Sequence, residues 1–134
     1  MYNLVPSYPN GKKGGLFMNT FDPEFWNLLD ELVHSSDIVI DRPKGSAHPR
    51  YPEQIYEADY GYLKGTASMD GGGIDVWVGT GGKEVDAFIC TVDIVKKDSE
   101  IKVLIGCTEE EKETIYKMHN RTSNMKGLLI RRPV

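Results

Sequence analysis

The fold is decided by residues 60–78, which read YGYLKGTASMDGGGIDVWV. Two short β-rich runs, 60–63 and 74–78, flank a glycine-rich turn. Asp70 precedes three glycines and Asp75 begins the second run, so the flexible turn can bring both carboxylates toward one point. Carboxylate oxygens suit a hard cation such as Mg²⁺, but an Asp-Gly pair is also common in simple hairpin turns. Taken alone, the stretch is compatible with either a structural turn or a metal site.

Further β-rich runs lie on both sides, at residues 37–41, 84–95 and 100–107. Four or five strands at this short spacing favour a small barrel or sandwich. Asp22 and Pro23 suit the start of a helix that runs to His34, since apolar residues recur at helical spacing. Thr108 followed by Glu111 is a capping box and predicts a second helix to about Met118.

Composition narrows the class of protein. The 134 residues carry 16 Lys and Arg against 20 Asp and Glu, a net charge of -4, which disfavours a general nucleic-acid binder. No apolar run approaches a membrane span, so we expect a cytoplasmic protein. Residues 1–20 are expected to be an irregular arm and 21–134 a single domain. Cys90 and Cys107 are interpreted as buried free thiols, although a disulfide between them stays open.

The later run from Asp98 places alternate residues on opposite faces of a strand. Asp98, Glu100 and Lys102 share one face, and the intervening aliphatic residues share the other. The polar face is either an ordinary solvated surface or part of a site. Turned into the mouth of a barrel, it would set a metal ligand beside a phosphate donor, as phosphoryl transfer requires.

The order of these residues resembles a known family, the soluble Mg²⁺-dependent inorganic pyrophosphatases of the small β-barrel type. The resemblance covers roughly residues 37–118. It implies a mainly β (α+β) fold with flanking helices, built on a small five-stranded OB-like β-barrel. The matching positions, in chain order, are Asp41, Arg50-Tyr51, Asp59-Tyr60-Gly61-Tyr62, Thr66, Asp70 to Val76, Glu100-Ile101-Lys102 and Tyr116-Lys117.

The resemblance also implies roles for these side chains in the hydrolysis of pyrophosphate by metal-activated water. Asp70, Asp75 and Glu100 would hold Mg²⁺, with Mn²⁺ as a substitute and Asp41 at the rim. Asp70, Asp75 and Lys102 form the implied catalytic set. The implied partners are pyrophosphate or a related phosphoanhydride, and a second copy of the chain. The implied donors to phosphate oxygens are Arg50, Tyr60, Lys102, Tyr116 and Lys117.

The sequence departs from the family pattern where that pattern carries its general base. Gly72 stands where the family has an aspartate that helps to deprotonate water. Pro52 removes a further acid unless Glu53 substitutes for it, and the hairpin that follows in the family is nearly deleted. Asp98 is the nearest counterpart of a missing late aspartate. Glu57 and Asp59 are either substitute bases or exposed loop acids. These departures leave a second reading, a catalytically impaired phosphate or nucleotide-binding module.

Two further readings have less support. An oligonucleotide-binding barrel would stack bases on Trp77 or Tyr60, but the acidic charge argues against it. The three histidines, His34, His48 and His119, lack the paired spacing of a zinc site and are expected at the surface or at helix ends.

Overall fold

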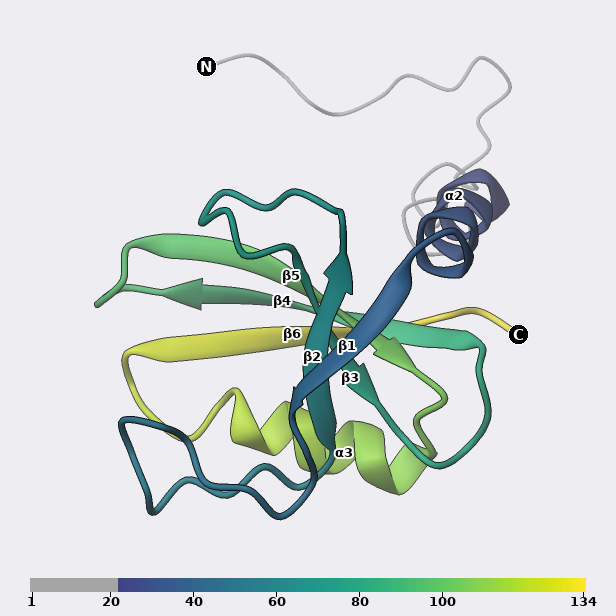
Figure 1. Cartoon of the computed structure of the whole chain (residues 1–134). Coiled ribbons are helices and arrows are strands. Elements are labelled where there is room, and N and C mark those ends of the chain that lie inside the picture. Colours follow the sequence, from purple (N-terminus) through teal and green to yellow (C-terminus); the bar gives the residue numbers. More distant parts are fainter. Residues whose placement is uncertain (1–21) are drawn as a thin grey trace, which may run out of the picture.

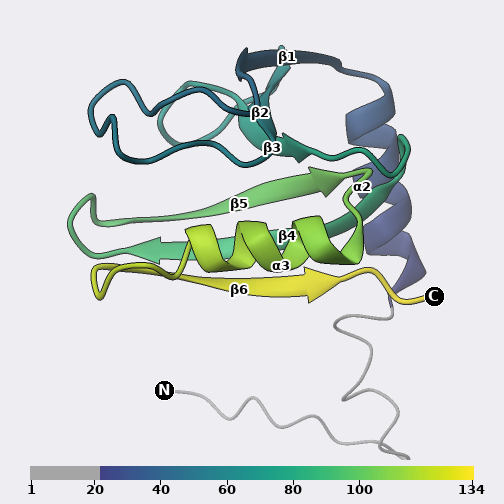
Figure 2. The same cartoon turned by 90° about the horizontal axis from the view of Figure 1, so that it is seen from below.

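A computed structural model describes residues 22–134, which form one six-stranded sheet with a helix on each side (Figures 1 and 2). The arm expected at residues 1–20 lies outside the described residues. The strands occur in the order β1-β2-β3-β5-β4-β6, and only β3 and β5 pair in parallel. The elements are α2 (Pro23–His34), β1 (Asp37–Arg42), β2 (Asp59–Lys64), β3 (Ile74–Val78), β4 (Val85–Asp93), β5 (Asp98–Ile105), α3 (Glu109–Met118) and β6 (Met125–Arg131).

Both helices begin at the caps that the sequence predicts. The side chain of Asp22 accepts a hydrogen bond from the backbone N–H of Glu24 at 2.9 Å, and Pro23 occupies the first turn of α2. At α3, Thr108 accepts from the Glu111 N–H, and the Glu111 carboxylate accepts from the Thr108 N–H at 2.8 Å. Each cap satisfies backbone donors that a helix leaves without partners.

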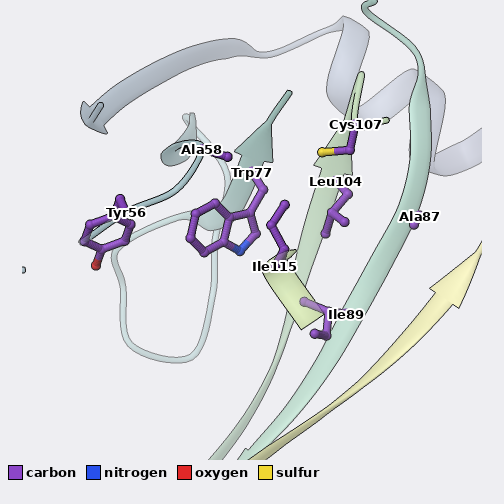
Figure 3. Close-up of a cluster of buried hydrophobic side chains, with 8 residues drawn as sticks. All are labelled: Tyr56, Ala58, Trp77, Ala87, Ile89, Leu104, Cys107 and Ile115. Carbon is purple, nitrogen blue, oxygen red and sulfur yellow. The ribbon is translucent and has the colours of Figure 1, made fainter. Parts of the chain in front are cut away.

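The sheet separates two apolar clusters, one under each helix. Trp77 is buried at the centre of the α3-side cluster, where Leu104 of β5 and Ile115 of α3 also lie (Figure 3). The other cluster gathers Trp26 and Val33 of α2 with aliphatic residues of β3, β4 and β5. The split follows from strand alternation, because successive side chains point to opposite faces. Polar residues that share the face of Trp77 are therefore brought toward the α3 side.

Gly61 allows β1 and β2 to pair closely. A Cβ atom at this position would lie 1.8 Å from the carbonyl oxygen of Val39, far inside van der Waals contact. Only a residue without a side chain fits there. The glycine of the Tyr-Gly-Tyr run therefore serves the sheet, while the tyrosines on either side of it face the opposite direction.

The mainly β class with flanking helices is confirmed, with two differences from the expected five-stranded barrel. The structure contains a sixth strand, β6, which pairs with β4. The sheet is also open, since within residues 22–134 the edge strands β1 and β6 do not pair with each other. Only a short apolar run marks β6 in the sequence, and its pairing depends on the exposed edge that β4 presents.

Both cysteines are free thiols, as the composition favoured, although Cys90 is only partly buried. Burial raises the pKa of the Cys107 thiol to about 12. None of the helices in the described part of the chain combines the length and apolar character needed to cross a bilayer.

Candidate active site

Four polar side chains meet on the α3 side of the sheet. Asp75 of β3 lies directly opposite Lys102 of β5. Tyr60 of β2 lies opposite Trp77, which is two residues after Asp75 on β3 and therefore on the same face of the sheet. Glu100 precedes Lys102 by two positions and so shares its face. The parallel pairing of β3 and β5 therefore brings together residues that lie far apart in the sequence. We refer to Tyr60, Asp75, Glu100 and Lys102 as the Lys102 cluster.

The ammonium group of Lys102 is the centre of this cluster. It donates to the hydroxyl of Tyr60 and to Oδ2 of Asp75, both at 2.8 Å, and lies 3.8 Å from the Glu100 carboxylate. Lys102 is only 7% exposed, although the strand is solvated nearby. The Lys102 end of this polar face is therefore buried and paired, and is not an ordinary solvated surface. A lysine this buried needs such partners, because an unpaired buried charge is costly.

Burial changes the acid–base properties of the cluster. It raises the pKa of the Glu100 carboxyl above its ordinary value, with Lys102 opposing the shift and Asp75 adding to it. Burial likewise raises the pKa of Tyr60, with Asp75 adding to the effect, so its phenol stays neutral. The cluster therefore offers a fixed cation, a neutral hydroxyl and carboxylates within one small volume.

Asp70 lies on the exposed turn before β3 and is held by its own loop. Its Oδ1 accepts from the Ser68 hydroxyl at 2.6 Å and from the Gly72 N–H at 2.8 Å. The bond from Ser68 contributes most to lowering the pKa of Asp70. The loop is closed at its base by Thr66, whose hydroxyl accepts from the Ile74 N–H at 2.9 Å. No hydrogen bond or ion pair within residues 22–134 joins Asp70 to the Lys102 cluster.

A second cation lies at the edge of the cluster, in the turn between β4 and β5. The ammonium of Lys96 is 3.5 Å from Oδ2 of Asp98 and 3.9 Å from Oε1 of Glu100. The other oxygen of Asp98, Oδ1, is buried and accepts no hydrogen bond from the described residues. The sequence pattern did not indicate that Lys96 lies near Glu100. Lys96 is in a turn, where strand alternation does not predict the direction of a side chain.

The remaining implied site residues lie away from these contacts. Asp41 is exposed within a bulge of edge strand β1, and Arg50 is exposed in the loop that follows. Tyr116 and Lys117 are exposed near the end of α3, the helix that packs through Ile115 on the Trp77 face of the sheet. Within residues 22–134, no ion pair or side-chain hydrogen bond joins any of the four to Lys102. Their roles stay predictions.

The two acids considered as substitute bases are engaged elsewhere. Oδ1 of Asp59 accepts from the Lys44 N–H at 2.8 Å, and Glu57 lies 3.5 Å from Arg121 in an exposed ion pair. Strand alternation also turns Asp59 to the face opposite Tyr60. Neither residue has a hydrogen bond or ion pair to the Lys102 cluster within residues 22–134; Glu57 is an exposed loop acid, whereas Asp59 is partly buried at the start of β2.

His119 lies at a helix end, one of the two positions expected for it, but it is not at the surface. It caps the end of α3, as a helix-end residue, but is buried, and its Nε2 accepts from Trp77 Nε1 at 3.1 Å. Burial lowers the pKa of His119 to about 3, so the ring stays neutral at pH 7. Trp77 is 1% exposed and so presents no face for base stacking, which contradicts that part of the oligonucleotide-barrel reading.

The carboxylates of the site have the right chemistry for a hard cation, but they do not converge. Asp75, Asp98 and Glu100 supply oxygen donors, and the unpartnered Oδ1 of Asp98 is the kind of atom that a cation satisfies. Nevertheless, in the part of the chain that is described, no three His, Cys, Asp or Glu side chains are grouped so as to hold a metal ion. Lys102 occupies one oxygen of Asp75, and Asp70 is turned into its loop.

Comparison with known proteins decides the family. A family model described as Inorganic Pyrophosphatase matches residues 31–131. The chain belongs to the inorganic pyrophosphatase family. The matched region runs from the last turn of α2 to the end of β6, and it contains every residue of the Lys102 cluster. A search of curated proteins found no match to this pyrophosphatase-family chain.

Among solved structures, the chain is similar to an inorganic pyrophosphatase from Helicobacter pylori. The two are 14% identical, the similarity covers 69% of this chain and 79% of the other, and the TM-score is 0.48.

Proposed function

We propose that the protein is a Mg²⁺-dependent hydrolase of pyrophosphate or a related phosphoanhydride, with the Lys102 cluster at the centre of its active site. The observation that carries the proposal is the direct pairing of Lys102 with Asp75, 2.8 Å apart, beside Tyr60 and Glu100 in a chain of this family. When bound, Mg²⁺ supplies Lewis-acid activation of water and neutralises phosphate charge. Mn²⁺ is the expected substitute.

Each residue of the cluster has a role suited to its chemistry. Asp75 and Glu100, with Asp70 after rotation out of its loop, would supply carboxylate oxygens to the cation, and Asp41 would add one at the rim. Lys102 and the neutral hydroxyl of Tyr60 would donate to phosphate oxygens, since a fixed cation and a phenol are strong donors. Burial raises the pKa of Glu100, so a bound cation would stabilise its charged form.

The three exposed donors that surround the Lys102 cluster in this proposal would complete the phosphate site. Arg50, Tyr116 and Lys117 are exposed and free to reorient, so they could close on a bound anion without breaking an ion pair that the described residues show. Self-association into a homo-oligomer and a cytoplasmic location remain predictions.

A second candidate function is a catalytically impaired phosphate or nucleotide-binding module of the same fold. The observation that favours it is Gly72, next to an Asp70 carboxylate that is already bound by its own loop. Loss of a general base typically lowers the rate about a hundredfold to ten-thousandfold. A slow enzyme and a binding module both remain compatible with such a site.

Phosphate release from pyrophosphate in the presence of Mg²⁺ or Mn²⁺ tests the proposal. The wild type is compared with Asp75→Asn, which keeps the size of the side chain, and with Asp59→Asn as a matched control on the other face of the sheet. We expect metal-dependent turnover that Asp75→Asn lowers at least a hundredfold and that Asp59→Asn retains. Absence of turnover in folded wild-type protein that still binds a diphosphate would favour the binding module. Equal turnover in both variants would contradict a role for Asp75.

A further inference from the structure

A bulge in edge strand β1 decides which of its side chains faces the same way as Tyr60. The strand pairs with β2 in regular register as far as Ile40, and then Arg42, rather than Asp41, lies opposite Tyr60. The extra residue of a bulge re-aims the side chains that follow it. Residues directly opposite each other in a sheet share one face. Arg42 therefore lies on the face that carries the Lys102 cluster.

The guanidinium of Arg42 holds the ring of Tyr56. It donates a hydrogen bond to the Tyr56 hydroxyl, and its central carbon lies 5.5 Å from the centroid of that ring. Tyr56 is only 8% exposed, and within residues 22–134 its hydroxyl makes no other hydrogen bond. A buried hydroxyl without a partner is costly. Arg42 is therefore the group that allows this hydroxyl to stay buried among aromatic rings.

Tyr56 in turn limits the positions open to Tyr60. The centroid of the Tyr60 ring lies 5.4 Å from that of Tyr56 and 4.6 Å from that of Trp77. Tyr56 and Trp77 also pack against each other, with centroids 5.8 Å apart (Figure 3). At the far end of the Tyr60 ring, its hydroxyl accepts from Lys102 at 2.8 Å. The place of Tyr56 therefore affects how the Tyr60 hydroxyl meets the buried ammonium.

We propose that Arg42 is a positioning residue of the active site, which fixes the Tyr60 hydroxyl on Lys102 by holding the Tyr56 ring in place. The inference rests on the proposed function of the same site, but it requires no metal ion and no contact between Arg42 and the substrate. It also differs from a simple effect of charge, because the guanidinium is needed only while Tyr56 carries a hydroxyl. Without that hydroxyl, the loss of Arg42 should matter little.

Four variants separate these effects. Arg42→Met removes the guanidinium and keeps much of the aliphatic stem. Arg42→Lys keeps a cationic donor. The double variant Arg42→Met/Tyr56→Phe removes the donor and the hydroxyl together, so no buried polar group is left without a partner. Lys64→Met, at the exposed end of β2, is the matched control for the loss of one positive charge.

Two measurements are made on each protein. Hydrolysis of pyrophosphate in Mg²⁺ gives kcat and KM. NMR spectra of protein labelled with ¹³C at the lysine Cε atoms report on Lys102, because its ammonium lies 5.4 Å from the centroid of the Tyr60 ring, whose ring current shifts nearby signals. The Lys102 signal is assigned by its absence from Lys102→Met.

We expect Arg42→Met to lower kcat about tenfold and to change KM by less than about twofold, since misplacement of a group by ~1 Å can cost up to about a hundredfold in rate. The Lys102 signal should move in the same variant. Arg42→Lys and the double variant should recover most of kcat and most of the wild-type shift. Lys64→Met should match the wild type in both measurements.

Three outcomes would overturn the inference. An unchanged Lys102 signal in Arg42→Met would show that Arg42 does not position the pair, and a double variant as impaired as Arg42→Met would show an effect of charge alone. A rise in KM at unchanged kcat would show that Arg42 binds the substrate instead. If the Lys102 signals follow the expected pattern but the wild type releases no phosphate, the positioning of Tyr60 by Arg42 holds and only the hydrolytic function fails.

Discussion

The pairing of Lys102 with Asp75 should be a measurable contribution to the stability of the protein without metal. Lys102→Met keeps most of the aliphatic stem and removes the ammonium that donates to Asp75 and Tyr60. The substitution leaves the Asp75 and Glu100 carboxylates side by side without their shared cation. We expect it to destabilise the folded state chiefly through these carboxylates rather than through lost packing.

The magnitude follows from burial. Breaking a fully buried ion pair by removing one partner costs about 3–5 kcal/mol. The side chains of Asp75 and Glu100 retain 23% and 19% exposure, so water can solvate them in part. We therefore expect a loss of about 2–3 kcal/mol for Lys102→Met, after allowance for this solvation. Asp75→Asn added to Lys102→Met should recover about 1–2 kcal/mol, because no unpaired Asp75 charge then remains.

Urea unfolding in a chelator measures the four corners of this double-mutant cycle. With a denaturant dependence of about 1–3 kcal/mol per molar, the midpoint of Lys102→Met should fall by roughly 0.7–3 M. Lys83→Met, at an exposed lysine in the turn between β3 and β4, is the control and should leave the midpoint nearly unchanged. Additivity of Lys102→Met and Asp75→Asn within about 0.5 kcal/mol would refute the reasoning, because directly interacting residues should be coupled.

Three further predictions test separate parts of the structure. Burial raises the pKa of Glu100, so its ionisation destabilises the folded state as the pH rises. Without metal, Glu100→Gln should therefore be more stable than the wild type at pH 8 but not at pH 4, as measured by urea midpoints. Burial lowers the pKa of His119 from 6.5 to about 3, so the wild type should be about 2 kcal/mol less stable at pH 5 than at pH 7. His119→Gln should flatten this pH dependence of the free energy of unfolding. An unchanged slope would contradict the burial of a neutral ring. Gly61→Ala should destabilise by more than about 4 kcal/mol because its Cβ would meet a carbonyl oxygen, whereas Gly45→Ala, with φ 91° and open space, should cost only about 1–2 kcal/mol in thermal unfolding. Similar costs for the two glycine variants would show that β1 can move away from β2.

Much of the candidate site was predictable because one strand carries an alternating pattern. Glu100 and Lys102 were expected on one face of β5, and the structure places both there with Asp75. The family resemblance implied that Asp75 and Lys102 meet, but no local pattern predicts their direct contact, because it depends on the parallel pairing of β3 with β5. The position of Lys96 was equally hidden, because the direction of a turn side chain follows from hydrogen bonds such as those to Asp93.

The amino-acid sequence by itself determined the elements of this protein and the polar face of its site. Caps, turns and alternation act over a few residues, so Asp22, Thr108 and the run from Asp98 could be interpreted locally. Only the tertiary structure decided that the sheet is open, that β6 completes it, and that His119 is buried against Trp77. These features depend on which strand edges and side chains meet across long stretches of chain, and no local pattern encodes such long-range contacts.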